Sequence, residues 1–302
     1  ISACLVGSEM CIRDRGRALQ MISARPERLQ AVTRNIEATI GVEYELIAVD
    51  NSVEGRGICA VYNEGASRAR YPFLCFVHED VEFLSQDWGV RALAHFSHDE
   101  GLALIGLAGS RYKAATPSGW HSGDDDDLCI NVLHGASRAS ANAAFAKPAD
   151  SGSAICVPVV ALDGVWLFAR RTAWVETRFD ERLGGFHFYD VDFSLRVARR
   201  GKIAVVFDIE LLHFSLGSFA EAWARQALAY ADAAPVALPF SCSTPSNPGL
   251  LRRKEAAAVR YWLRLLRRAQ LPWALRIRWL RAVGILRLSL IHISEPTRQA
   301  EI

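Results

Sequence analysis

Apolar residues along the chain gather in short continuous runs, and these runs alternate with segments of helical spacing. A continuous apolar run of four to eight residues is typical of a buried strand. The predicted strands cover residues 19–22, 44–50, 73–77, 102–109, 162–169 and 202–213. The predicted helices cover residues 26–41, 57–70, 87–96, 189–201 and 219–232. Alternating helices and wholly apolar strands indicate an α/β fold with a mostly parallel sheet and helices on both faces.

Two regions depart from this alternation. Residues 111–154 are rich in Ser, Gly, Asp and Ala, and they predict a long loop that passes over one edge of the sheet. Pro and Ser mark residues 235–249 as a linker. Beyond it, two amphipathic helices separated at Pro272 carry many arginines on their polar sides. The pattern predicts a main domain over 16–235, followed by the linker and basic helices over 236–288.

The two ends of the chain lack any clear period. Residues 5–15 and 288–298 both resemble translated sequencing-adapter read-through. We therefore expect residues 1–15 to be a non-native leader and residues 289–302 a non-native tail, outside the fold. The alternative is that both are ordinary termini of the protein.

Composition limits the classes of function. The formal net charge is +2, so the whole molecule has no general attraction to nucleic acid. The seven cysteines are scattered without a CxxC pair, which favours a reducing compartment and gives no support to a zinc site. No apolar run reaches the roughly 18 residues of a membrane-spanning helix. These features predict a cytoplasmic protein, and the basic helices predict contact with the inner face of a membrane.

Polar residues stand where two of the predicted strands end. Asp50 and Asn51 follow one strand, and His78 and Asp80 follow the next. Ligands bind at the carboxyl ends of strands in such sheets. A His-x-Asp pair there could hold Mg²⁺ or Mn²⁺, and Asp50 with Asn51 could bind a nucleotide. The simpler interpretation is a solvated strand end and an Asp-Asn turn.

More candidate residues come later in the chain. Asp190 and Asp192 open a helix, where one carboxylate can cap free N–H groups and the other can act as a general base. Asp163 and Gly164 precede a strand and could contact a substrate or form only a turn. His213 ends a strand and is either a third metal ligand or a structural histidine.

The ordered set of these motifs resembles the family-2-like glycosyltransferases with the GT-A fold. The resemblance covers roughly residues 19–215 and is clearest over 47–52, 60–81 and 163–201. It implies transfer of a sugar from a nucleotide-diphosphate sugar to an acceptor hydroxyl, with inversion and with Mn²⁺ or Mg²⁺. It also implies a glycan or lipid-linked acceptor and a place in bacterial cell-surface polysaccharide synthesis.

The resemblance also implies roles for single residues. Asp50 corresponds to a contact to the nucleotide, Asp80 to the direct metal ligand with His78 beside it, and Asp190 to the catalytic base. Asp163, Gly164 and Asp192 correspond to the acceptor side of the site, where Asp192 also supports the base.

Two positions depart from the family pattern. His78 stands where the family has the first Asp of D-x-D, and Tyr189 where it has a Glu. These departures leave open a second hypothesis, a non-catalytic GT-A-like module that binds a glycan or a protein partner.

Overall fold

The structure is a computed structural model, which describes residues 17–23, 26–51, 55–215, 219–243 and 247–284 of the 302-residue chain. Within these ranges the side chains of residues 17–23, Pro26 and Asp50 are not described.

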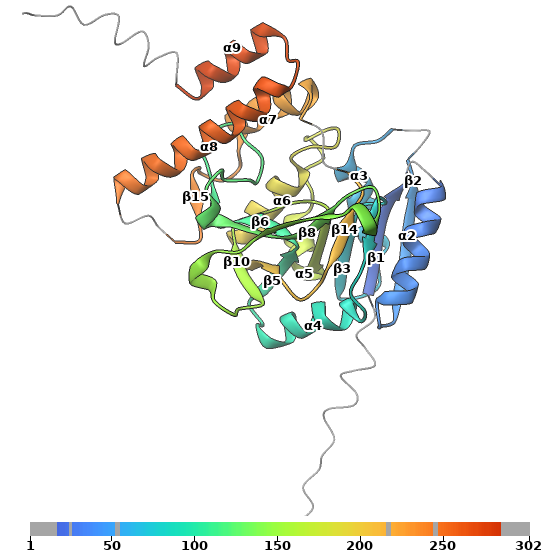
Figure 1. Ribbon diagram of the computed structural model, residues 1–302. Coiled ribbons are helices and arrows are strands. Elements are labelled where there is room, and N and C mark those ends of the chain that lie inside the picture. The colour runs from blue at the N-terminus through green and yellow to red at the C-terminus, as the bar shows by residue number, and fades with distance from the viewer. Residues whose placement is uncertain (1–16, 24–25, 52–54, 216–218, 244–246, 285–302) are drawn as a thin grey trace, which may run out of the picture.

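The main sheet contains seven strands of the described chain, in the order β10-β13-β5-β12-β3-β1-β2 (Figure 1). In chain order these strands are β1 (Arg17–Ser23), β2 (Tyr44–Asp50), β3 (Phe73–Val77), β5 (Leu102–Gly106), β10 (Cys156–Val159), β12 (Trp166–Arg170) and β13 (Lys202–Val206). The first strand, β1, pairs in parallel with both β2 and β3.

The predicted α/β fold is confirmed, and its main sheet is mixed rather than purely parallel. Strand β12 runs antiparallel to both β3 and β5, and β10 runs antiparallel to β13. An apolar run reports that a strand is buried, but it carries no information about direction. The reversal matters for the site because Trp166 lies opposite Val77. The turn that precedes β12 is thereby placed beside the carboxyl end of β3.

Helices cover both faces of the main sheet, as the pattern predicted. One face packs against α2 (Pro26–Thr39) and α4 (Trp88–His98), and the other against α3 (Ile58–Arg68), α5 (Arg171–Thr177) and α6 (Tyr189–Ala198). Alternate residues of β3 belong to the two cores: Cys75 and Val77 to the first, Leu74 and Phe76 to the second. This alternation is the expected two-residue period of a strand that is buried on both sides.

A second sheet lies over the carboxyl edge of the first and includes two strands from the segment that was predicted as a long loop. Its strands are β4 (Val81–Phe83), β6 (Ala108–Ser110), β8 (Leu128–His134), β9 (Asn142–Ala146), β11 (Ala161–Leu162) and β14 (Leu211–His213). Strands β8 and β9 pair antiparallel inside residues 111–154, so the loop prediction was wrong there. The run predicted over 202–213 is two strands, β13 and β14, which belong to different sheets.

The C-terminal helices pack on the main domain through an aromatic core of their own. These helices are α7 (Glu221–Ala233), α8 (Pro248–Arg268) and α9 (Trp273–Ala282), and a short pair of strands, β7 (Tyr112–Lys113) and β15 (Phe240–Ser241), lies beneath them. The rings of Trp223 and Trp262 stack at a 4.6 Å centroid distance. In the part of the chain that is described, no helix has the length and apolar character needed to cross a bilayer.

Candidate active site

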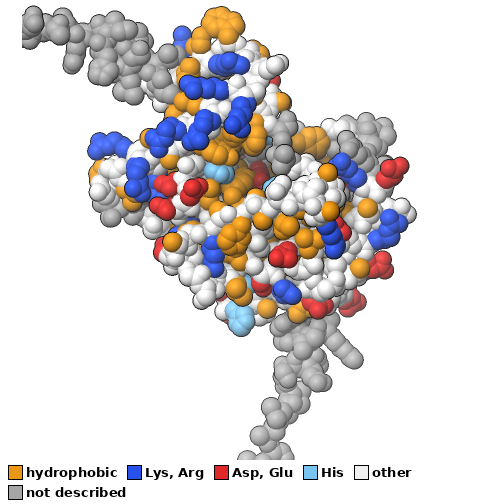
Figure 2. Space-filling view, viewed as in Figure 1, with side chains coloured by type: hydrophobic (Ala, Val, Ile, Leu, Met, Phe, Trp, Pro, Cys, Tyr) orange, Lys and Arg blue, Asp and Glu red, His pale blue; other side chains and the backbone are white. Residues whose placement is uncertain are grey.

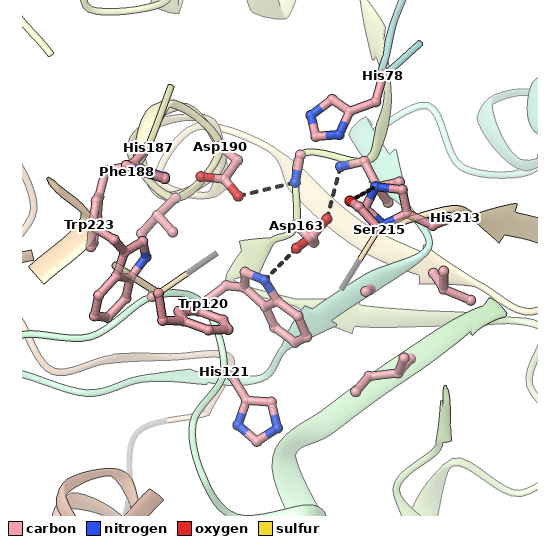
Figure 3. A pocket seen from close by; sticks show the side chains of 18 of the residues that line it. His78, Trp120, His121, Asp163, His187, Phe188, Asp190, His213, Ser215 and Trp223 are labelled. Carbon is pink, nitrogen blue, oxygen red and sulfur yellow. Dashed lines mark hydrogen bonds between the residues drawn. The ribbon is translucent and has the colours of Figure 1, made fainter. Parts of the chain in front are cut away.

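The carboxyl end of β3, the turn before β12, the first turn of α6 and the end of β14 surround one cavity of about 490 Å³ (Figure 3). Five predicted residues line it directly: His78, Asp163, Gly164, Asp190 and His213. Strand pairing explains the convergence, because β12 is antiparallel to β3 and its start therefore meets the end of β3.

His78, Asp80 and His213 form a group that could hold a metal ion. One nitrogen or oxygen ligand atom from each lies within 4.8 Å of the other two. His213 Nε2 is 3.3 Å from Asp80 Oδ1, and His78 Nδ1 is 3.9 Å from the same oxygen. Burial acts to raise the pKa of Asp80, but the hydrogen bond and charge of His213 outweigh it, so the net shift of that pKa is downward. Asp80 is therefore an anion at neutral pH.

Tyr189 connects this group to the first turn of α6. Its hydroxyl lies 2.7 Å from His78 Nε2 and donates to the Gly164 carbonyl oxygen at 3.1 Å. Because the Tyr189 hydroxyl donates its proton to Gly164, its oxygen can accept a hydrogen bond from the Nε2–H group of His78. The other ring nitrogen of His78, Nδ1, then faces Asp80. Gly164 has no room for a side chain, because a Cβ there would lie 1.9 Å from the Tyr189 hydroxyl.

Asp190 follows Tyr189 and directs its carboxylate into the same cavity. Its Oδ2 accepts a hydrogen bond from the Gly164 amide at 3.1 Å. Burial, reinforced by the negative charge of Asp163, raises the pKa of Asp190 to about 7. Its position in the first turn of α6 and three backbone N–H groups limit the rise. A carboxyl group with this pKa can exchange a proton near neutral pH.

Asp163 lies beside Asp190, but both of its carboxylate oxygens have partners. Oδ1 accepts from the Val165 amide at 2.9 Å, and Oδ2 accepts from the Trp120 indole N–H at 2.7 Å (Figure 3). Asp163 thus has a fixed orientation, acts on Asp190 through its charge and fixes the indole of Trp120.

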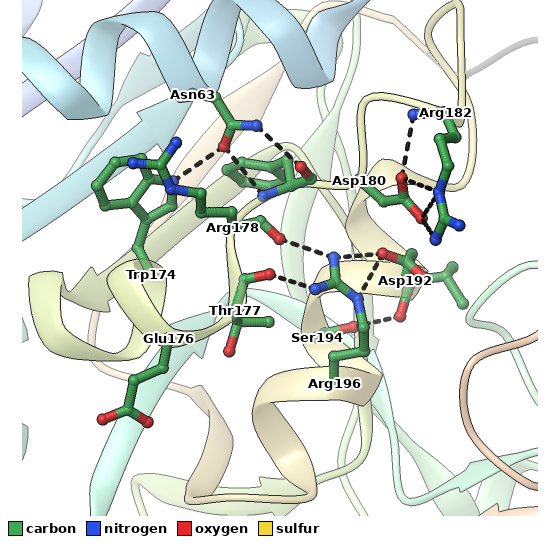
Figure 4. Close-up of polar contacts among 12 residues, drawn as sticks. Asn63, Trp174, Glu176, Thr177, Arg178, Asp180, Arg182, Asp192, Ser194 and Arg196 are labelled. Carbon is green, nitrogen blue, oxygen red and sulfur yellow. Dashed lines mark hydrogen bonds and ion pairs between the residues drawn. The ribbon is translucent and has the colours of Figure 1, made fainter.

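Asp192 is not part of the cavity. Its side chain is 2% exposed and pairs with the Arg196 guanidinium one helical turn later, with an Arg196 Nε–Asp192 Oδ2 distance of 2.8 Å (Figure 4). Arg196 also donates to the carbonyl oxygens of Thr177, the last residue of α5, and of Arg178, which follows it. The structure therefore corrects the predicted acceptor-side role: residues two apart on a helix face different directions, and Asp192 joins α6 to α5.

The predicted nucleotide-binding residues lie at the end of β2, separated from β3 by β1. The side chain of Asp50 lies outside the part of the chain that is described. The Asn51 side chain is buried and exchanges two hydrogen bonds with the Arg56 backbone, each of 2.8 Å. These bonds join the end of β2 to the segment that leads into α3, so they give Asn51 a structural role in place of the predicted ligand contact.

Several residues of the site were not predicted from the sequence. Arg28 on α2 is 3.5 Å from Asp80 Oδ2, and the aromatic side chains of Trp120, Tyr261 and Trp262 line the cavity. Trp120 lies in the segment predicted as a loop, and the other two lie on α8, far along the chain. Their presence depends on tertiary packing, and we find no local motif that marks them.

The polar group at the edge of this α/β sheet and the arrangement of its strands define a GT-A-type protein. The chain belongs to the Glycosyltransferase like family, which it matches over residues 27–232. No curated protein sequence matches it.

Solved structures with a similar fold have low sequence identity to the chain. S. aureus TarS (residues 1–349) aligns at 12% identity and a TM-score of 0.51, over 89% of this chain and 79% of that one. The mannosyltransferase PcManGT from Pyrobaculum calidifontis, solved with GDP-Man and Mn²⁺, aligns at 11% identity and a TM-score of 0.48, over 94% of this chain and 81% of that one. GalNAc-T7, solved with UDP, GalNAc and Mn²⁺, aligns at 11% and 0.47 over 67% of this chain, which spans 44% of that protein. The TarS similarity supports the GT-A fold.

Proposed function

We propose that the protein is a metal-assisted, inverting glycosyltransferase that moves a sugar from a nucleotide-diphosphate sugar to an acceptor hydroxyl. One observation carries the proposal: His78 and His213, which form a possible metal-binding group with Asp80, line the same cavity as the buried carboxyl group of Asp190. Asp50, at the end of β2, is the proposed contact to the nucleotide.

The three metal-binding candidates fit a divalent cation. Asp80 supplies a charged oxygen ligand, and His78 and His213 supply imidazole nitrogens. Two imidazoles in a set of three favour Mn²⁺ over Mg²⁺, which prefers oxygen ligands and water. When bound, such a cation neutralises charge on the departing diphosphate.

Asp190 is the proposed general base. Its carboxylate takes the proton of the acceptor hydroxyl as the oxygen bonds to the anomeric carbon, on the face opposite the bond to the diphosphate. That bond breaks with its electron pair on the diphosphate, so configuration inverts. The Gly164 amide holds the Asp190 carboxylate in place. Burial and the charge of Asp163 raise the pKa of Asp190, so that this carboxylate can accept a proton near neutral pH.

The test is transfer or hydrolysis across a panel of UDP and GDP sugars with Mn²⁺. We expect Asp80→Ala to lose metal-dependent nucleotide binding, and Asp190→Asn to keep binding while turnover falls by about 10²–10⁴-fold. Thermal unfolding would confirm that both variants are folded. Full activity in both variants would exclude the mechanism. Metal-dependent binding without any turnover in the wild-type protein would instead support the non-catalytic module.

The basic ridge on the C-terminal helices supports a second part of the proposal, contact with an anionic membrane surface. The ridge consists of nine exposed arginines: Arg252, Arg253, Arg260, Arg264, Arg267, Arg268, Arg276, Arg278 and Arg281. Figure 2 shows Lys and Arg side chains in a row over α8 and α9. Among the described residues, the ion pair recorded for this ridge is a 3.9 Å contact between Arg253 and Asp126.

Such a surface suits anionic lipid headgroups. It would bring the site close to a glycan or lipid-linked acceptor at the cytoplasmic face of a bacterial membrane, in cell-surface polysaccharide synthesis.

A further inference from the structure

The cavity has two chemically different ends, with the Asp163–Asp190 pair between them (Figure 3). His78, His213 and Ser215 lie at one end. The other end is aromatic, and its lining residues include Trp120, His121, Trp223, Tyr261 and Trp262. If the diphosphate of the donor occupies the first end, the molecule that presents its hydroxyl to Asp190 must lie against the second.

Trp120 is held in a fixed orientation at the aromatic end. Its indole N–H donates to Asp163 Oδ2 at 2.7 Å, and its ring lies 5.5 Å from the His121 ring, centroid to centroid. Because the other Asp163 oxygen is bound by the Val165 amide, the carboxylate cannot rotate without losing a hydrogen bond. A half-buried indole fixed in this way is an aromatic surface beside the proposed base.

Helix α8 completes the aromatic end. Tyr261 stacks on His121 at 3.8 Å with an interplanar angle of 6°, and Trp262 stacks on Trp223 at 10°. The Trp262 indole also donates to the His121 carbonyl oxygen at 3.0 Å. The family match ends at residue 232. Tyr261 and Trp262 come after it, so this wall of the cavity is formed by residues outside the matched region.

We propose that Trp120 is the platform for a sugar ring of the acceptor, and that the acceptor is therefore a carbohydrate. The inference rests on the proposed glycosyltransferase function and assigns its acceptor class. The C–H groups on a pyranose face carry partial positive charge and suit the negative face of an indole, while the hydroxyl groups at its edge need polar partners. The cavity offers both, because Asp190 and His187 line it together with Trp120. A wholly aliphatic chain would leave these polar groups without partners.

The experiment is saturation-transfer difference NMR on the full chain with a panel of methyl glycosides, without donor. The panel contains methyl α- and β-glycosides of glucose, galactose, mannose, N-acetylglucosamine and N-acetylgalactosamine, and an octyl glucoside below its micellar concentration. We expect ring C–H saturation from at least one sugar, a reduction of about tenfold with Trp120→Ala, and partial retention with Trp120→Phe. Trp273→Ala, at a 75% exposed tryptophan on α9, is the matched control and should equal wild type.

Three results would overturn the proposal: no ring saturation from any sugar in the panel with wild type, equal saturation with Trp120→Ala, or saturation confined to the octyl chain. Should Trp120→Ala fail to fold, Trp120→Phe is compared with the Trp273→Ala control. A reduced sugar signal in Trp120→Phe supports the proposal, and an unchanged signal overturns it. Calorimetry of UDP and GDP with Mn²⁺ is run on the same samples. Absence of nucleotide binding in the wild-type protein would reject the glycosyltransferase function. If the Trp120 variants bind nucleotide as wild type does, their loss of sugar signal is specific to the acceptor end of the cavity.

Discussion

The His78 imidazole and the Tyr189 hydroxyl meet at 2.7 Å between Nε2 and oxygen. This contact joins a residue at the end of β3 to the residue that directly precedes Asp190. This hydrogen bond therefore links the predicted cation-binding group to the helix turn that carries the proposed base. His78 and Tyr189 are 111 positions apart in the chain.

Tyr189→Phe should weaken metal binding while leaving the fold intact. It removes the hydroxyl that orients His78, and loss of such an orienting partner typically costs about 10–100-fold in metal affinity. Titration with Mn²⁺ by calorimetry measures the effect. Tyr62→Phe is the control, because its ring is a buried neighbour of Tyr189 at 5.8 Å. Equal Mn²⁺ affinity in Tyr189→Phe and wild type would contradict the assignment.

Gly164→Ala should disrupt the site through a steric clash. The added Cβ would lie 1.9 Å from the Tyr189 hydroxyl and 2.4 Å from its ring carbon. Forcing that ring aside should cost about 1–3 kcal/mol of stability and abolish transfer. Chemical denaturation and activity assays report the two effects. Gly184→Ala meets nothing within 4 Å and should behave as wild type in both.

The dependence of activity on pH should report Asp190. Its pKa is raised to about 7, and the base works when deprotonated, so kcat/KM should fall as pH decreases below neutrality instead of near pH 4. Asp163→Asn removes the charge that contributes to the rise and should move this acid limb to lower pH. An acid limb that stays in place in Asp163→Asn would show that another group controls it.

The same shift has a consequence for stability. Between pH 3.8 and about 7 the folded protein binds more protons at Asp190 than the unfolded chain does, so this carboxyl lowers stability progressively as pH rises through that window. Asp190→Asn should therefore gain stability relative to wild type from pH 4 to pH 7 and show a constant difference above pH 7. Urea unfolding at several pH values measures it.

Asp192→Asn should destabilise the protein without a specific effect on catalysis. Removing one partner of the buried pair leaves the Arg196 guanidinium without its carboxylate, which costs about 3–5 kcal/mol for a fully buried pair and somewhat less here, where Arg196 is partly exposed. Urea unfolding should show the loss, while kcat of the folded protein stays near wild type. A fall in kcat as large as that of Asp190→Asn would place Asp192 in the chemistry instead.

Replacing Arg260, Arg264 and Arg267 together by Gln should weaken binding to vesicles that contain phosphatidylglycerol. Each arginine near such a surface contributes about 1 kcal/mol, and added salt should reduce binding further. Co-sedimentation with phosphatidylglycerol and phosphatidylcholine vesicles measures the difference. Arg182→Gln, at an exposed arginine outside the basic ridge, is the control. Equal binding to both vesicle types would remove the membrane proposal.

Much of the fold followed from local pattern. Helical spacing and apolar runs predicted α2, α3, α4 and every strand of the main sheet except β10, and polar residues after β3 marked the edge where the cavity lies. Strand direction was not predictable, because an apolar run such as 166–170 is equally buried in either orientation. Strand β8 was missed because it lies among small and polar residues that resemble a loop.

The site was predictable only where chemistry and sequence position coincide. His78, Asp163, Asp190 and His213 stand at strand or helix ends, and the structure brings them to one cavity. Asp192 and Asn51 have the same residue types in similar places, but their partners, Arg196 and the Arg56 backbone, are set by tertiary geometry and by a local turn. The aromatic residues from α8 gave no local signal, because their role depends on where that helix packs.

Helix α8 stacks Trp262 on Trp223 of α7 and so contributes one wall of the cavity from a late part of the chain. The residues around Asp80 are fixed by the two sheets, whereas one wall is supplied by α8, which is separate in sequence and is joined to the main domain by aromatic stacking and by polar contacts of Lys254 and Glu255. Substitutions on α8 can therefore change the shape of the aromatic end of the cavity while the geometry around His78, Asp80 and His213 stays unchanged. Exchange of this helix between related chains would be a direct way to alter acceptor choice independently of the donor.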